Sequence, residues 1–113
     1  MISESELVGR IGRLEIRILY EWIEMGLVAP HRSEAGYLFD EADVARINLV
    51  CDLSFDMGVG HESLPIILSL IDQLHRTRHS LRALADAIAE QPEDVKSLIT
   101  ARAQRTLTGR EDE

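Results

Sequence analysis

An apolar stripe in the second half of the chain limits the folds open to this sequence. Its members, Ile67, Leu74, Leu81 and Ile88, are spaced seven apart. Seven residues make about two turns of an α-helix, so these side chains share one face of a long helix. We expect this helix to begin within residues 62–66, where Pro65 is tolerated in the first turn. Because the stripe is too long and narrow for so small a core, we expect it to pack on a second copy of the chain.

The composition predicts one soluble, mainly helical domain. The 113 residues are 45% hydrophobic, and the aromatic residues are one Trp, two Tyr and two Phe. The core must therefore consist of Leu, Ile, Val and Ala, a mixture that suits helices. The lone cysteine, Cys51, cannot form an internal disulfide and falls on an apolar helix face, so we expect it to be buried. The first residues lack the charge pattern of a signal peptide and no apolar run is long enough to span a membrane, so we expect a cytoplasmic protein.

The net charge of −8 argues against a nucleic-acid partner. Binding to nucleic acid rests on Lys and Arg that neutralise phosphates, and residues 47–74 contain neither. The same stretch carries four acidic residues, Asp52, Asp56, Glu62 and Asp72. A basic protein is a better electrostatic match to this negative charge than a nucleic acid is.

Shorter elements are expected before the long helix. They are a helix over residues 3–9, a helix from Leu14 to Met25, a hairpin over residues 31–39, and a helix from Asp40 to Met57. Gly26 and Gly58 are typical helix-ending residues, and Asp40 is a typical N-cap. The chain then divides into residues 1–60, the long helix over 61–91, and a segment over 92–113. In that last segment we expect a short amphipathic helix that frays from about Thr106.

Three motifs resemble the winged helix-turn-helix of MerR-type proteins. In chain order they are Gly26-Leu27-Val28-x-Pro30, Gly36-Tyr37-Leu38-Phe39 and Glu41-x-Asp43-x-x-Arg46. The resemblance implies a mainly α fold in which the helix before Gly26 is the recognition helix and the hairpin is the wing. It also implies a homodimer joined by an antiparallel coiled coil of the long helix.

A second set of motifs is similar to the chaperone-modulator (CbpM) family, an offshoot of the MerR-type proteins. They are Tyr20-Glu21-Trp22-Ile23-x-x-Gly26, Asp52-Leu53-x-x-Asp56-Met57-Gly58-Val59 and Ile67-Leu68-x-Leu70-Ile71-Asp72-Gln73-Leu74, and the similarity covers about residues 3–90. It implies a non-enzymatic protein that binds the J-domain of a CbpA-like, DnaJ-type co-chaperone and inhibits its stimulation of Hsp70. The J-domain carries a basic helix, and the acidic residues of positions 47–74 are the candidates to bind it. A solvated acidic face is the other interpretation of the same residues.

The alternative function is that of a dimeric, MerR-like, DNA-binding transcription regulator. In such regulators the recognition helix typically ends in Arg-Tyr-Tyr and the wing carries an Arg after Gly-Tyr. Here Tyr20-Glu21-Trp22 and Leu38 occupy those places, so groups that would contact phosphates are missing. Three candidates to face DNA remain, namely Arg13, Arg17 and Arg32. An adaptor of unrelated purpose is a third option.

No catalytic, cofactor or metal motif stands out. His75 and His79 lie four apart, as a helical metal clip would require, but no third ligand is near them in the sequence. There is no Gly-rich phosphate loop and no nucleophile elbow. Trp22 ends the recognition helix, and we expect it to anchor the core or the wing, with a role in partner binding as the second interpretation.

Overall fold

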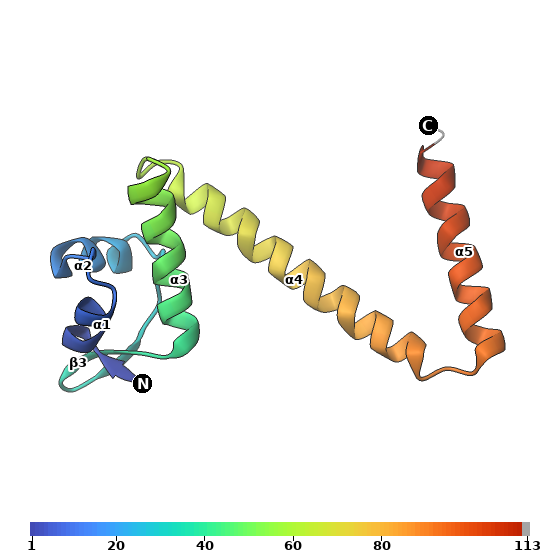
Figure 1. The fold of residues 1–113 in the computed structure, drawn as a ribbon, viewed down its shortest axis with the longest axis horizontal. Helices are drawn as coiled ribbons and strands as arrows, with labels where there is room; N and C mark the ends of the chain where they lie inside the picture. Colours follow the sequence, from blue (N-terminus) through green and yellow to red (C-terminus); the bar gives the residue numbers. More distant parts are fainter. Residues whose placement is uncertain (112–113) are drawn as a thin grey trace. The chain divides into compact units, whose positions relative to one another are not determined.

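The computed structural model describes residues 1–111, with side chains through residue 109. The chain is mainly helical and divides into two compact units, Met1–Ile71 and a second that begins at Asp72 (Figure 1). The first unit contains the helices α1 (Glu4–Arg10), α2 (Ile16–Glu24), α3 (Glu41–Cys51) and η1 (Asp52–Asp56), the strands β1 (Ile2–Ser3), β2 (His31–Ser33) and β3 (Gly36–Phe39), and the start of α4 (Leu64–Ala89). The second unit contains the rest of α4 and α5 (Glu93–Glu111).

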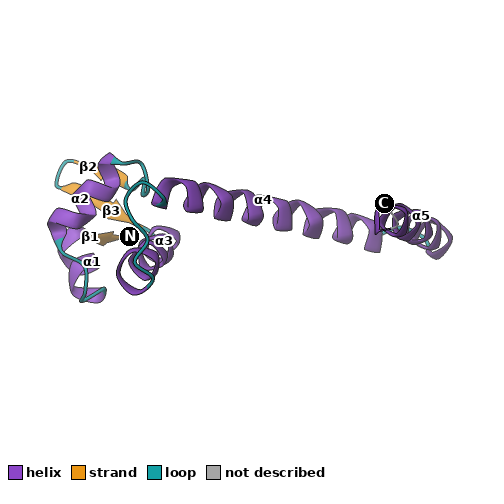
Figure 2. Cartoon of the chain, turned by 90° about the horizontal axis from the view of Figure 1, so that it is seen from above, coloured by secondary structure: helices purple, strands orange, loops and turns teal. Residues whose placement is uncertain are grey.

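The wing is a three-stranded antiparallel sheet in the order β1-β3-β2 (Figure 2). The expected hairpin is present, with His31 of β2 opposite Leu38 of β3. The other edge of β3 pairs with β1, where Ile2 lies opposite Phe39. Strand β1 was not predicted, because two residues are too few to carry an alternating pattern.

Helix ends in the first unit follow local signals in the sequence. The Ser3 side chain caps α1 by accepting a hydrogen bond from the Glu6 amide. Asp40 caps α3 through a capping box, in which Asp40 and Asp43 each accept a hydrogen bond from the other's backbone amide. Gly26 follows the end of α2 with φ of 75°, a left-handed conformation that glycine adopts without strain. The predicted N-cap at Asp40 is confirmed.

The predicted helix from Asp40 to Met57 is two elements rather than one. After α3 the backbone widens into the π-helix η1, in which the Met57 amide donates to the Asp52 carbonyl at 3.0 Å. The wider turn places one additional residue in the helix and rotates the side chains that follow it. Gly58, with φ of 68°, ends the element as expected.

The core of the first unit is built mostly from aliphatic side chains, as the composition predicts. Trp22 and Phe39 are its aromatic members, and the Trp22 side chain is 0% exposed. Cys51 is also fully buried, which confirms that prediction. The first turns of α4 close the core through the buried Leu64 and Leu68. Because of this packing, the first compact unit extends through Ile71 and its boundary falls inside α4.

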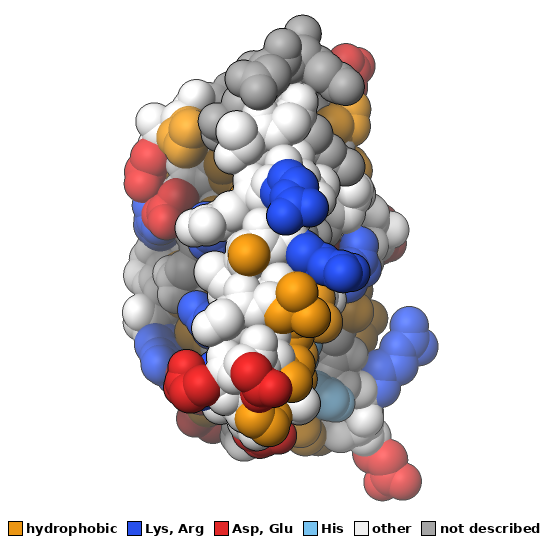
Figure 3. Space-filling model, turned by 90° about the vertical axis from the view of Figure 1, so that its right-hand side faces the viewer, with side chains coloured by type: hydrophobic (Ala, Val, Ile, Leu, Met, Phe, Trp, Pro, Cys, Tyr) orange, Lys and Arg blue, Asp and Glu red, His pale blue; other side chains and the backbone are white. Residues whose placement is uncertain are grey.

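In the second unit, α5 is longer than the short segment that the sequence predicts. It runs from Glu93 through the expected fraying point at Thr106, whose hydroxyl donates to the Arg102 carbonyl at 3.1 Å. Residues 101–105 are Ala, Arg and Gln, all strong helix formers, so the helix continues without an apolar stripe. Figure 3, with α5 toward the viewer, shows hydrophobic and charged side chains interspersed along it. Residues 112–113, for which fraying was also expected, lie outside the described residues. No helix in the described part of the chain is long and apolar enough to cross a membrane.

Candidate partner-binding surface

Arg13 is the centre of an ion-pair cluster on the first unit. It lies in the loop between α1 and α2, and its guanidinium reaches both carboxylates of η1. One pair joins Arg13 Nη1 to Asp56 Oδ2 at 2.9 Å, and the other joins Arg13 to Asp52. These hydrogen bonds, which Arg13 donates to Asp52 and Asp56, raise the pKa of Arg13, and the bond to Asp52 has the larger effect. All three side chains remain partly exposed, so the cluster is held at the surface.

This cluster joins residues that the sequence assigned to opposite functions. Arg13 was a candidate to face DNA, while Asp52 and Asp56 were candidates to bind a basic helix. In the structure each is the other's partner, so a phosphate would have to compete with two carboxylates for Arg13. Sequence reasoning could not find the pairing, because Arg13 is 39 residues from Asp52.

The other two arginine candidates differ in their surroundings. Arg17 pairs with Glu21 of the next helical turn at 3.2 Å and with Glu15 at 3.7 Å. Arg32 lies over the Tyr37 ring of the wing, with its guanidinium carbon 5.9 Å from the ring centroid. Arg17 is thus neutralised by its own helix, and Arg32 makes a cation–π contact.

The two remaining acidic candidates are not part of the Arg13 cluster. Glu62 is exposed in the turn before α4. Asp72 is half-buried and belongs to the second unit. Within the first unit, then, the predicted acidic set consists of a paired part on η1 and of Glu62, for which the described residues provide no partner.

Sequence reasoning missed a network that fixes the wing. Glu4 accepts a hydrogen bond from the Tyr20 hydroxyl at 2.6 Å and another from the Tyr37 amide at 3.2 Å. The first of these raises the pKa of Tyr20. Gly36, with φ of 119°, leaves room for the Glu4 carboxylate, which would lie 3.2 Å from an added Cβ. The Gly36-Tyr37 motif marks the wing in the sequence, but nothing in it points to Glu4 as the partner.

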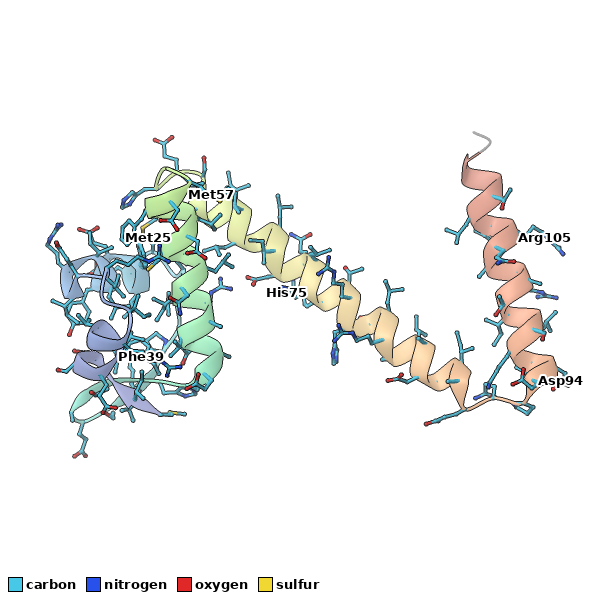
Figure 4. All side chains as sticks on the ribbon, viewed as in Figure 1. Met25, Phe39, Met57, His75, Asp94 and Arg105 are labelled. Atoms are coloured by element: carbon cyan, nitrogen blue, oxygen red, sulfur yellow. The ribbon has the colours of Figure 1, made fainter. Side chains whose placement is uncertain are left out.

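One group of described residues has the donor atoms and spacing of a metal site. His31 Nε2 lies 3.2 Å from Asp40 Oδ2 and 4.0 Å from Asp43 Oδ2. Both carboxylates already cap α3, so this group has a structural role. His75 and His79 are not in this group, and His75 lies along α4 (Figure 4).

The apolar stripe of α4 has two parts. Ile67 is half-buried and packs against the core of the first unit. Further along the helix, Leu74 is 47% exposed and Leu81 is 60% exposed, while Ile88 is half-buried near the start of α5. A large part of the stripe is therefore uncovered in a single chain.

A comparison with protein families agrees with this architecture. Residues 4–86 match the family model described as "MerR HTH family regulatory protein". Searches of the curated proteins and of the solved structures returned no match. The matched region includes α2, strands β2 and β3 of the wing, and most of α4, which are parts of a winged helix-turn-helix followed by a long helix. From this match and this fold, the chain belongs to the MerR HTH family of regulatory proteins.

Proposed function

We propose that this chain regulates by binding a protein and not by reading DNA. Its partner is the J-domain of a CbpA-like, DnaJ-type co-chaperone, whose stimulation of Hsp70 it restrains without any enzymatic step. The ion pairing of Arg13 and Arg17 carries the proposal. Both guanidinium groups that a MerR-type reader would turn toward phosphates are paired with carboxylates of the same chain, which offset their positive charge.

Charge supports the same choice. The net charge of −8 repels a phosphate backbone and attracts a basic segment. The carboxylates of Asp52 and Asp56 are more than half exposed although they are paired, so a cation from a partner reaches them. In this mechanism the J-domain's basic helix competes with Arg13 for η1, gains a further contact at Glu62, and becomes unavailable to Hsp70.

Calorimetric titration with the J-domain from the same organism, at low and high salt, tests this function. We expect saturable binding that weakens at higher salt, mainly through slower association. The double variant Asp56→Lys/Glu62→Lys should lower the affinity by about tenfold or more. The matched control, Glu34→Lys/Glu90→Lys, changes the net charge equally at exposed sites elsewhere. Absence of heat at both salt concentrations, together with no effect on Hsp70 stimulation, would contradict the proposal.

A variant of Arg13 separates this function from DNA binding. Arg13→Gln frees the carboxylates of Asp52 and Asp56, so the affinity for the J-domain should rise, by about two- to fivefold for an exposed pair. If the chain reads DNA, the same variant loses a cation that faces the duplex, and binding weakens. Titration of both ligands against the variant gives opposite signs for the two functions.

The alternative function keeps one specific observation in its favour. Arg32 in the wing is not held by a carboxylate in the described part of the chain, and the family description is that of a regulatory protein. Fluorescence anisotropy with a palindromic DNA duplex at several salt concentrations tests it. A steep fall of affinity with salt, lost in Arg32→Gln, would establish DNA binding.

A further inference from the structure

A groove on the first unit lies between the start of α2 and η1. It is lined by Arg13, Glu15, Arg17, Ile18 and Phe55 and has a volume of about 230 Å³. The sequence singled out two of these residues, Arg13 and Arg17, but only as groups to face DNA. The fold brings them beside an aromatic ring from η1 instead.

Phe55 contacts the core and is also exposed to solvent. Its ring packs on the buried Trp22 with 5.7 Å between centroids, yet the residue is 43% exposed. The ring therefore packs on the core and is still partly open to water. A rigid, partly exposed aromatic side chain beside a groove is a typical anchor point for a partner.

The groove together with its rim is net negative. The lining itself holds two guanidinium groups, Arg13 and Arg17, and one carboxylate, Glu15. The rim consists of the three further carboxylates that pair with these guanidinium groups, namely Glu21, Asp52 and Asp56. Each pair is exposed, so its carboxylate can change partners at little cost. An apolar floor with this rim is complementary to a cationic segment that carries one large apolar side chain.

We propose that this groove is the docking site for such a basic segment of a protein partner. An apolar side chain of the segment lies against Phe55, and its Lys or Arg groups take the place of Arg13 on Asp52 and Asp56. This inference rests on the proposed function for the identity of the partner. It adds a location and an apolar anchor, whereas the sequence had indicated only acidic residues.

Amide NMR mapping on the full chain tests the location without any variant. Two probes are titrated separately, the J-domain and a synthetic helical peptide of Leu and Lys. An otherwise identical peptide with acetylated lysines is the charge control. We expect shifts centred on Ile18 and Phe55 with both cationic probes and none with the acetylated peptide. Shifts centred elsewhere with both probes would overturn the inference.

Substitution measures the contribution of the anchor. Phe55→Ala should weaken peptide binding by about tenfold, as expected for an aromatic anchor. Ile66→Ala, which removes an apolar side chain that is 63% exposed on α4, should leave the affinity within about twofold. Equal affinities for Phe55→Ala and the wild-type chain would overturn the inference.

The two probes separate this inference from the proposed function. If the peptide shifts the amide signals of the groove and the J-domain does not bind, the inferred docking site is supported and the co-chaperone assignment fails. If the J-domain binds and shifts amide signals elsewhere, the proposed function is supported and the inferred docking site is contradicted. If the same amides shift when the chain alone is concentrated, or when duplex DNA is added, the occupant is a second copy or nucleic acid, and the inference is overturned.

Discussion

Trp22 shows how much of the first unit's stability rests on one side chain. It is fully buried among aliphatic residues of α2, α3 and α4, and it supports Phe55 of η1. Trp22→Ala should lower the free energy of unfolding by about 3–5 kcal/mol, because it leaves a cavity in a packed core. Ile47→Val, at a residue that is also 0% exposed, should cost about 0.5–1.5 kcal/mol. Urea denaturation followed by circular dichroism measures both, and a similar small loss for the two variants would show that Trp22 is not an anchor.

Asp40 links the stability of the wing to pH. The Asp43 amide, and then His31, lower the pKa of the Asp40 carboxyl below its usual range. The stabilising contribution of the ionised Asp40 is therefore present above about pH 4 and is lost as pH falls through the lowered pKa.

The pH dependence is measured against Asp40→Asn, which still caps a helix but does not ionise. The wild-type chain should be more stable than this variant near neutral pH, and the difference should shrink as pH falls to about 3. Urea titrations at several pH values give the difference directly. A difference that grows on acidification would contradict the assigned role of Asp40.

Among the elements, the turn after η1 depends on glycine at one of its two glycine positions. Gly58 has φ of 68°, a conformation in which an added Cβ costs about 1–2 kcal/mol. Gly60, two residues later, has no left-handed conformation and no heavy atom within 4 Å of an added Cβ. Gly58→Ala should therefore destabilise the chain by about that amount and Gly60→Ala should not. Thermal unfolding of both variants checks this, and equal losses would place the strain elsewhere.

The elements that were predictable from sequence are those fixed by local chemistry. The hairpin over 31–39, the N-cap at Asp40 and the stop at Gly58 each depend on a few adjacent residues, and the structure has all three. The π-helix was not predictable, because its residues also fit the periodicity of an ordinary helix. The long-range contacts of Arg13 and Glu4 were not predictable either, because each joins residues more than fifteen positions apart.

At the scale of the whole molecule, the exposed part of the α4 stripe predicts self-association. We propose that the chain is a homodimer joined through α4, because Leu74 and Leu81 are too exposed for a single chain to leave uncovered. Leu74→Glu/Leu81→Glu should halve the mass measured by light scattering, while the circular dichroism of the helices is retained.

The matched control for this experiment is on the neighbouring helix. Leu107 of α5 is 60% exposed, as is Leu81, but it is not part of the α4 stripe. Leu107→Glu should leave the mass unchanged. A wild-type chain that is monomeric at the concentrations used would contradict the proposed homodimer.

The burial of Cys51 makes its thiol a probe of how readily the core of the first unit opens. Its thiol is the only one in the chain, lies against the core at the end of α3, and has a pKa that burial raises. A chromogenic disulfide reagent requires an accessible thiolate, so it reacts only during those moments when the core opens. The rate of colour development thus reports how readily this unit opens. A ligand that slows this rate when it binds is one that stabilises the closed unit.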